Sequence, residues 1–261
     1  MFNFQLLKSF IKHRLIAKTR HGVHSPFVYR LIDEVIYDFN HRSEYNDIEQ
    51  LRSELLSDRR LISITDLGAG SHVNNNKRKE VRQLAKSALK PPALAKLIHR
   101  LTNDLKPHNI IELGTCLGLT TAYLAKAAPD ARVISIEGCP ETAKVAAENL
   151  ARLDLDRVSV LTGNFDEVFP RVLAGQQTAD LIFVDGNHRK EATLNYFHWA
   201  LPHMKDEGMM IFDDIYWSKG MEEAWEDIKA HPDVTVTIDL FWIGLVFFRK
   251  GQAKEHFKVR F

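Results

Sequence analysis

Hydrophobic and polar positions follow different patterns on the two sides of residue 107. Before this point, apolar residues recur mainly at helical spacing, which predicts helices over about 3–19, 26–38, 46–58, 78–89 and 92–105, with little strand signal. After it, short and almost continuously apolar runs alternate with amphipathic stretches. We therefore expect a helical cap region at residues 1–106 and a main domain at residues 107–261.

The apolar runs of the main domain have the composition of strands that are covered on both faces. They are Asn109–Leu113, Arg132–Glu137, Val158–Gly163, Asp180–Asp185 and Gly208–Asp213. Strands that alternate with helices predict right-handed crossovers and a doubly wound parallel sheet, the α/β Rossmann-like class. Two further runs, Val234–Leu240 and Gly244–Arg249, are separated by only three residues. So short a link predicts an antiparallel hairpin at the sheet edge.

The amino-acid composition excludes only a few classes of protein. The chain has 261 residues, of which 45% are hydrophobic and 26% charged, and a formal net charge of +1. This balance is typical of a globular protein and gives no global signal for nucleic acid. No apolar run approaches the ~20 residues of a transmembrane helix. Cys116 and Cys139 are too few for a disulfide framework, and we expect a reducing, cytoplasmic location.

The N-terminal segment has its own charge pattern. No acidic residue occurs before Asp33, whereas six Lys and Arg residues do, and apolar residues from Phe4 to Leu15 recur at helical spacing. We expect a basic amphipathic helix that packs on the main domain. A membrane-surface helix and an organellar transit peptide are the alternatives.

A polar or acidic group stands at the carboxyl end of each expected parallel strand. Ligands of open α/β sheets bind beyond these ends, so the groups define a candidate site. They are the Glu112–Gly118 loop, Glu137, Gly163-Asn164, Asp185 to His188, and Asp213-Asp214.

The loop after the first strand differs from a dinucleotide-binding loop. Cys116 occupies the position where the glycine of such a loop lets a pyrophosphate approach, and Glu112 precedes the loop. A carboxylate repels phosphate but suits a cation, and S-adenosylmethionine carries a sulfonium, an ammonium and no phosphate. Glu137 stands where a carboxylate can accept hydrogen bonds from ribose hydroxyls. The residues favour S-adenosylmethionine over NAD, with an NAD-dependent oxidoreductase as a rival.

A second glycine-rich segment, Thr65 to Ser71, has a similar sequence. It is followed by polar residues and not by an apolar helix, which a nucleotide-binding loop requires. We therefore assign cofactor binding to residues 112–118 and leave the role of the Asp66–Ser71 loop open.

Glu112-x-Gly114-x-x-x-Gly118, Glu137, Gly163-Asn164 and the final hairpin together resemble the class I S-adenosylmethionine-dependent methyltransferases, over about residues 107–250. The resemblance implies a seven-stranded sheet whose last strand is antiparallel. It also implies roles for single residues. The methionine part of the cofactor would be bound by Glu112, Gly114, Thr115 and Gly118, the ribose by Glu137, and the adenine by Asn164 and Phe165. The family often has Asp at the position of Asn164.

The acidic residues after the last two parallel strands are similar to the metal site of the catechol and sugar O-methyltransferases. In this resemblance Asp185, Asp213 and Asp214 would bind a cation, and carboxylate oxygens suit Mg²⁺ or Mn²⁺. The catechol enzymes have Asp-Asn where this chain has Asp213-Asp214. Two alternatives need no metal: Asp214 could cap the next helix, and Asp185 could support the methionine end of the cofactor.

The reaction class follows from the same segments. The Asn/Asp-Pro-Pro-aromatic run of base-amine methyltransferases is absent after Val184, and neither cysteine lies where a pyrimidine-methylating nucleophile is needed. His188, three residues after Asp185, is the candidate general base. Tyr216 and Trp217 would form either an aromatic wall of the acceptor pocket or ordinary packing.

We therefore expect metal-assisted O-methylation of a small hydroxylated acceptor. One alternative is a metal-independent N- or O-methyltransferase for another acceptor, including RNA. The other is a non-catalytic cofactor-binding scaffold. The sequence leaves open whether the chain forms a homodimer.

Overall fold

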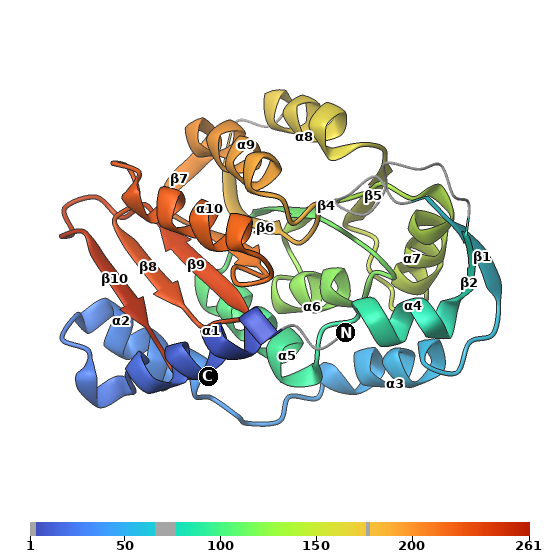
Figure 1. Cartoon of the computed structure of the whole chain (residues 1–261). Helices are drawn as coiled ribbons and strands as arrows, with labels where there is room; N and C mark the ends of the chain where they lie inside the picture. Colours follow the sequence, from blue (N-terminus) through green and yellow to red (C-terminus); the bar gives the residue numbers. More distant parts are fainter. Residues whose placement is uncertain (1–3, 66–76, 176–177) are drawn as a thin grey trace. The chain divides into compact units, whose positions relative to one another are not determined.

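The computed structural model describes residues 4–65, 77–175 and 178–261, which form two compact units (Figure 1). The terminal unit contains residues 1–38 and 176–261, and the central unit contains residues 39–175. The cap boundary expected at residue 107 stays a prediction, because compactness of the chain trace does not test it.

Three parallel strands form the sheet of the central unit in the order β3-β4-β5. The strands are β3 (Asn109–Leu113), β4 (Arg132–Glu137) and β5 (Val158–Thr162). The connections contain α6 (Leu119–Ala127) and α7 (Pro140–Arg152), and α8 (Phe165–Ala174) follows β5. The bounds of β3 and β4 are those expected from their apolar runs. Parallel pairing places the ends of β3 and β4 at one edge, with Leu113 opposite Ile136.

The central unit begins with helices and a two-stranded sheet. Its elements are α3 (Tyr45–Leu55), β1 (Leu61–Ile64), β2 (Lys77–Glu80), α4 (Val81–Ala88) and α5 (Pro92–Leu105). The antiparallel pair β1-β2 was not expected, and the start of the helix predicted at residue 78 was wrong by three residues. Glu80 caps α4 instead, through a reciprocal bond with Gln83.

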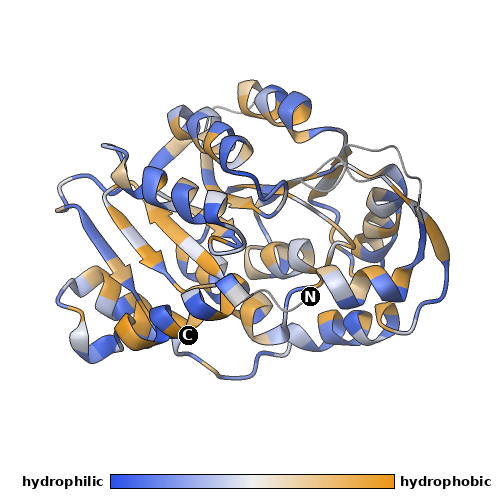
Figure 2. Cartoon of the chain, viewed as in Figure 1, coloured by the Kyte–Doolittle hydropathy of each residue, from blue (hydrophilic) through white to orange (hydrophobic). Residues whose placement is uncertain are grey.

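Five strands form the sheet of the terminal unit, in the order β10-β8-β9-β7-β6. They are β6 (Ala179–Val184), β7 (Met204–Asp213), β8 (Val236–Asp239), β9 (Ile243–Phe247) and β10 (Glu255–Lys258). β6 and β7 are parallel, and β9 is antiparallel to both β7 and β8. The predicted antiparallel hairpin of β8 and β9 is confirmed, but its place at the sheet edge was wrong, because β10 pairs with β8 there. The helices α9 (Lys190–Ala200) and α10 (Lys219–Ala230) and the short η3 (Leu201–His203) connect these strands. Figure 2 shows that β9 consists mainly of hydrophobic residues.

The N-terminal helices belong to the same unit. They are α1 (Phe4–Ile16), η1 (Arg20–Gly22), α2 (Pro26–Arg30) and the π-helical η2 (Leu31–Ile36). The contact of His13 with Asp239 of β8 confirms that α1 packs against the protein. Just after α1, Lys18 forms an isolated parallel bridge with Val259, which directly follows β10.

The fold class is the expected α/β Rossmann-like one, with a mixed sheet, antiparallel C-terminal strands and N-terminal helices. β10 is additional to the seven strands that the resemblance implied. Its polar sequence, Glu255-His256-Phe257-Lys258, carries no strand periodicity, and parallel pairing with β8 supplies its hydrogen bonds. None of the helices in the described ranges combines the length and the apolar composition that crossing a bilayer requires.

Candidate active site

The loop after β3 has a backbone that depends on glycine. Gly114 and Gly118 have φ angles of +104° and +79°, which side chains with a Cβ rarely adopt. At Gly118 a Cβ would also lie 3.3 Å from both the Cβ and the carbonyl oxygen of Ala146 on α7. The loop that we expected to bind the methionine part is therefore a tight turn, and its shape needs these two glycines.

Glu112 lies fully buried at this turn. Its Oε2 accepts hydrogen bonds from the Thr121 hydroxyl, at 2.5 Å, and from the Ser135 hydroxyl, at 2.6 Å. Ser135 also lies 2.5 Å from the hydroxyl of Thr115. These hydroxyls solvate a buried carboxylate that would otherwise be costly. Sequence reasoning missed Thr121 and Ser135 because their types are common and only the fold brings them to Glu112.

Glu137 joins two loops at the carboxyl end of β4. Its Oε2 accepts from the backbone N–H of Cys116, at 2.8 Å, and its Oε1 from the backbone N–H of Cys139, at 2.9 Å. The Cys139 amide directly precedes α7. This arrangement fixes the carboxylate beside the glycine turn, in the place from which we expected it to reach a ribose.

Asn164 caps the helix that follows β5. Its Oδ1 accepts from the backbone N–H of Asp166 at 3.1 Å, and α8 begins at Phe165. Gly163 has a φ of +153°, and a Cβ there would lie 2.7 Å from Val168. The structure thus gives Asn164 a capping role, and the expected adenine contacts of Asn164 and Phe165 stay predictions.

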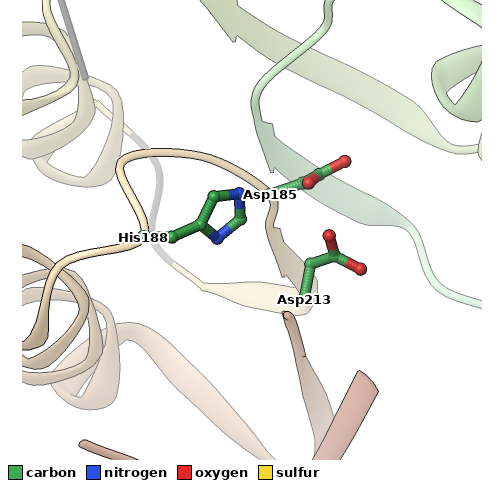
Figure 3. Close-up of side chains that lie close together, drawn as sticks. All are labelled: Asp185, His188 and Asp213. Carbon is green, nitrogen blue, oxygen red and sulfur yellow. The ribbon is translucent and has the colours of Figure 1, made fainter. Parts of the chain in front are cut away.

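Asp185, His188 and Asp213 lie together in the terminal unit (Figure 3). Parallel pairing sets Val184 opposite Phe212, so the residue after β6 and the last residue of β7 are neighbours. One ligand atom from each of the three side chains lies within 4.8 Å of the others. Asp213 is buried, whereas Asp185 and His188 are partly exposed.

A hydrogen-bonded turn positions His188. Asn187 has a φ of +52°, its side-chain amide donates to the buried Tyr196 hydroxyl at 2.9 Å, and Arg189 Nε donates to its Oδ1 at 2.8 Å. Tyr196 comes from α9, which starts two residues after His188. Tyr196 was not selected from the sequence, and Asn187 was included only as part of the Asp185 to His188 segment, because their contact is visible only in the folded turn.

Asp214 lies beside this group and not in it. Its Oδ2 is 3.8 Å from His188 Nε2, and its backbone N–H donates to the Trp242 carbonyl at 2.8 Å. The helix after it is capped by Ser218, whose hydroxyl accepts from the Met221 N–H at 3.2 Å. The capping alternative for Asp214 is therefore wrong.

Tyr216 packs within the terminal unit. Its ring stacks on Phe241 at a centroid distance of 4.8 Å, and its hydroxyl donates to Asp239 Oδ2 at 2.6 Å. Burial raises the pKa of this hydroxyl. Lys258 Nζ donates to the same hydroxyl at 2.8 Å. Of the two alternatives for Tyr216, these contacts support packing, whereas 53% of Trp217 is exposed.

The side chains at the acidic group fit a divalent cation. Asp185 and Asp213 offer hard carboxylate oxygens, the ligands that Mg²⁺ and Mn²⁺ prefer, and His188 adds an imidazole nitrogen. Two carboxylates in such proximity also repel each other unless a positive charge lies between or beside them. Asp185 and Asp213 were both expected at this place, and His188 was expected as a base.

Comparisons with known proteins agree with this geometry. Residues 111–215 match the model of a methyltransferase domain family. The chain is 30% identical over 137 residues to a catechol O-methyltransferase of Mycobacterium tuberculosis, covering 52% of this chain and 60% of that protein. It is 32% identical over 127 residues to a catechol O-methyltransferase of Niastella koreensis, covering 48% of this chain and 57% of that protein. Each match thus spans less than two thirds of the relative's length.

Solved structures share the fold. An O-methyltransferase from Bacillus cereus in complex with SAH has a TM-score of 0.57 and 20% identity, covering 81% of this chain and 93% of its own. Cofactor-bound Rv0187 from MTB has a TM-score of 0.59 and 20% identity, covering 88% and 99%. Residues 111–215 thus match a methyltransferase domain, and over about half of its length the chain is similar to the catechol O-methyltransferases.

Proposed function

We propose that the chain transfers a methyl group from S-adenosylmethionine to a hydroxyl oxygen of a small acceptor, with the help of Mg²⁺ or Mn²⁺. The observation that carries the proposal is the grouping of Asp185, His188 and Asp213 within 4.8 Å at the ends of β6 and β7. Two carboxylates so close together repel each other, and a bound cation would offset that repulsion.

The cofactor is assigned to the central unit. The glycine turn from Gly114 to Gly118, with Glu112 and Thr115, would bind the methionine part, and Glu137 would bind the ribose. Support comes from the two positive φ angles of the turn and from the fixed Glu137 carboxylate. The negative charge of Glu112 favours a sulfonium or ammonium nearby, because its burial limits screening by water.

The cation would be held by Asp185 and Asp213, with Asp214 close by. A divalent cation bound there would lower the pKa of an acceptor hydroxyl and so make its oxygen a better nucleophile. Asp185 and Asp213 would also position the acceptor, because the two carboxylates define where a cation can bind and therefore where the acceptor hydroxyl can lie.

His188 takes the proton. In the displacement, the acceptor oxygen forms a bond to the methyl carbon while the carbon–sulfur bond breaks, and the sulfonium becomes a neutral thioether. The hydroxyl proton passes to the His188 imidazole. The protonated ring is then stabilised by Asp214, whose Oδ2 lies 3.8 Å from Nε2.

The acceptor class follows from the relatives named catechol O-methyltransferase. We infer a small molecule with a phenolic or vicinal hydroxyl. We also place the protein in a reducing compartment such as the cytoplasm, since Cys116 and Cys139 are both free thiols.

The test is catechol methylation by the full chain, measured as S-adenosylhomocysteine formed. EDTA should abolish turnover and added Mg²⁺ should restore it. Asp213→Asn should lower kcat/KM by at least about 100-fold, because it removes a cation ligand. Asp206→Asn is the matched control, since Asp206 lies on the same strand and is paired with Lys250 at 2.6 Å.

Calorimetry with S-adenosylhomocysteine tests cofactor binding separately from cation-dependent turnover. Asp213→Asn should still bind it, because the cofactor residues lie elsewhere. Turnover that survives both EDTA and Asp213→Asn would instead favour a metal-independent methyltransferase. Cofactor binding without turnover of any hydroxylated acceptor would favour the scaffold alternative.

A further inference from the structure

Helix α1 is apolar on two sides. One side packs on the terminal unit: the Phe10 ring lies 5.0 Å from that of Phe241, Ser9 donates to Glu222 at 2.8 Å, and His13 Nε2 lies 3.0 Å from Asp239 Oδ1. The opposite side carries Leu7, Ile11 and Leu15, which are 40%, 51% and 79% exposed. Packing on the protein accounts for the first side only.

The exposed aliphatic residues form one stripe. Leu7, Ile11 and Leu15 are spaced four residues apart, so they share one face of the helix. Of the ten exposed large hydrophobic side chains in the described residues, four lie on this short helix, the fourth being Ile16. Single exposed apolar residues are normal on a protein surface, but a contiguous group indicates an interaction site.

Cations lie on both sides of the stripe. Lys8 and Lys12 follow the first two aliphatic residues by one position, which places them along one side, and Arg14 lies on the other side. Each of the three is exposed. Lysine and arginine stems extend along an apolar surface while their charged ends stay in water, so these residues do not interrupt the stripe.

The positive charge of the segment before Asp33 indicates what kind of partner this face binds. Six Lys and Arg residues and no acid precede Asp33, whereas the remainder of the chain holds 29 of its 35 basic residues and all 34 acidic ones. A second copy of the chain docked through this face would bring like charges together. A partner with a flat apolar layer below a layer of negative charge fits both the stripe and its flanks.

We propose that α1 docks the protein on an anionic lipid bilayer, with Leu7, Ile11 and Leu15 inserted below the headgroups. A helix of this kind lies in the plane of the interface, where its binding depends on apolar burial and on anionic lipid together. Trp242 extends the contact: it is 43% exposed and its ring lies 6.2 Å from that of Phe10. Tryptophan is enriched at membrane interfaces. The inference does not depend on the proposed catalysis.

The test is flotation of the full chain with vesicles of phosphatidylcholine alone and of phosphatidylcholine with phosphatidylglycerol. Binding to the anionic vesicles only, weakened by salt, is expected. Lys8→Gln/Lys12→Gln should weaken it roughly fivefold per lysine. Leu7→Gln/Ile11→Gln/Leu15→Gln should weaken it by roughly tenfold per residue or more.

Leu56→Gln/Leu61→Gln is the matched control, because both leucines are exposed, at 37% and 62%, and neither belongs to α1. Thermal unfolding of each variant shows that it is folded. Absence of binding to the anionic vesicles, or equal binding to the neutral ones, would overturn the proposal. So would a dimer in sedimentation analysis that needs Leu7, Ile11 and Leu15, because a second copy would then cover the stripe.

Discussion

His188 has two roles open to it at the scale of single atoms. Its ring belongs to the group with Asp185 and Asp213, so it could act as a cation ligand, and it lies 3.8 Å from Asp214, which would stabilise it after it accepts a proton. Removal of the ring distinguishes the two roles: loss of a base lowers kcat, whereas loss of a ligand raises the Mg²⁺ concentration that activity requires.

We expect His188→Gln to lower kcat by about 100-fold or more and to leave the Mg²⁺ concentration for half-maximal activity unchanged, because a base is lost and the two carboxylates remain. Steady-state kinetics at several Mg²⁺ concentrations measure both quantities. His198→Gln, at an exposed position of α9, is the control. A large rise in the Mg²⁺ requirement would show that His188 is a ligand.

The proximity of Asp185 and Asp213 could be predicted from the sequence, because both residues end parallel strands. That His188, and not Asp214, lies in the group with these two residues could not be predicted from the sequence. This grouping depends on backbone conformation, because Asn187 and Asp214 both have a positive φ, at +52° and +53°. The pattern of hydrophobic residues in the sequence does not predict such φ angles. Likewise, the hydroxyls around Glu112 come from Thr121 and Ser135, which lie on other elements of the central unit.

At the scale of elements, the strands with long apolar runs were predictable and the polar ones were not. β3 and β4 have the expected bounds: three of the five residues of β3 and three of the six residues of β4 are apolar. β2 is Lys77-Arg78-Lys79-Glu80 and gains its strand conformation only by pairing with β1. The sequence had instead predicted a helix that begins at residue 78.

Three helices meet around a buried histidine in the central unit. His99 on α5 has no exposed surface, and its ring lies 4.9 Å from Tyr45 of α3 and 6.2 Å from Tyr123 of α6. Burial lowers the pKa of His99 to about 4, and the charge of Glu44 opposes this shift only in part. The packed helices therefore hold the ring neutral.

Folding stability should fall as this histidine is forced to take up a proton. The unfolded chain binds it near pH 6.5, its usual pKa, and the folded chain only near pH 4, so stability is complete above pH 6.5 and declines below it. Between pH 7 and 4.5 the loss amounts to roughly 2 to 3 kcal/mol. Urea unfolding of the wild type and His99→Gln should show a shallower decline in the variant. Parallel pH curves would exclude His99 as the source.

At the scale of the whole molecule, the fold class was predictable because strands and helices alternate from Asn109 onward. The compact units were not, since residues 1–38 join residues 176–261 through contacts remote in sequence, such as His13 with Asp239 and Arg14 with the Phe261 carbonyl. No local pattern near either end of the chain indicates these pairings.

A cofactor that binds only the folded protein should raise its unfolding temperature. S-adenosylhomocysteine at about 100 times its dissociation constant adds about 2.7 kcal/mol, which corresponds to an increase of roughly 5 to 10 °C for a chain of this size. NAD at the same concentration should leave the midpoint unchanged, since Glu112 disfavours a pyrophosphate. Differential scanning calorimetry measures both. Stabilisation by NAD and not by S-adenosylhomocysteine would instead support the alternative function, an NAD-dependent oxidoreductase.

Gly244 of β9 lies directly under the Trp225 ring of α10, where a Cβ would approach the ring to 2.6 Å. Any larger residue would lift α10 away from the sheet. Because only four residues, 215–218, separate Asp214 from α10, such a shift would reach the acids through the chain itself. The identity of one residue on the strand beside the acids, where Gly244 is paired with Phe212, thus restricts how the acidic site can diverge during evolution.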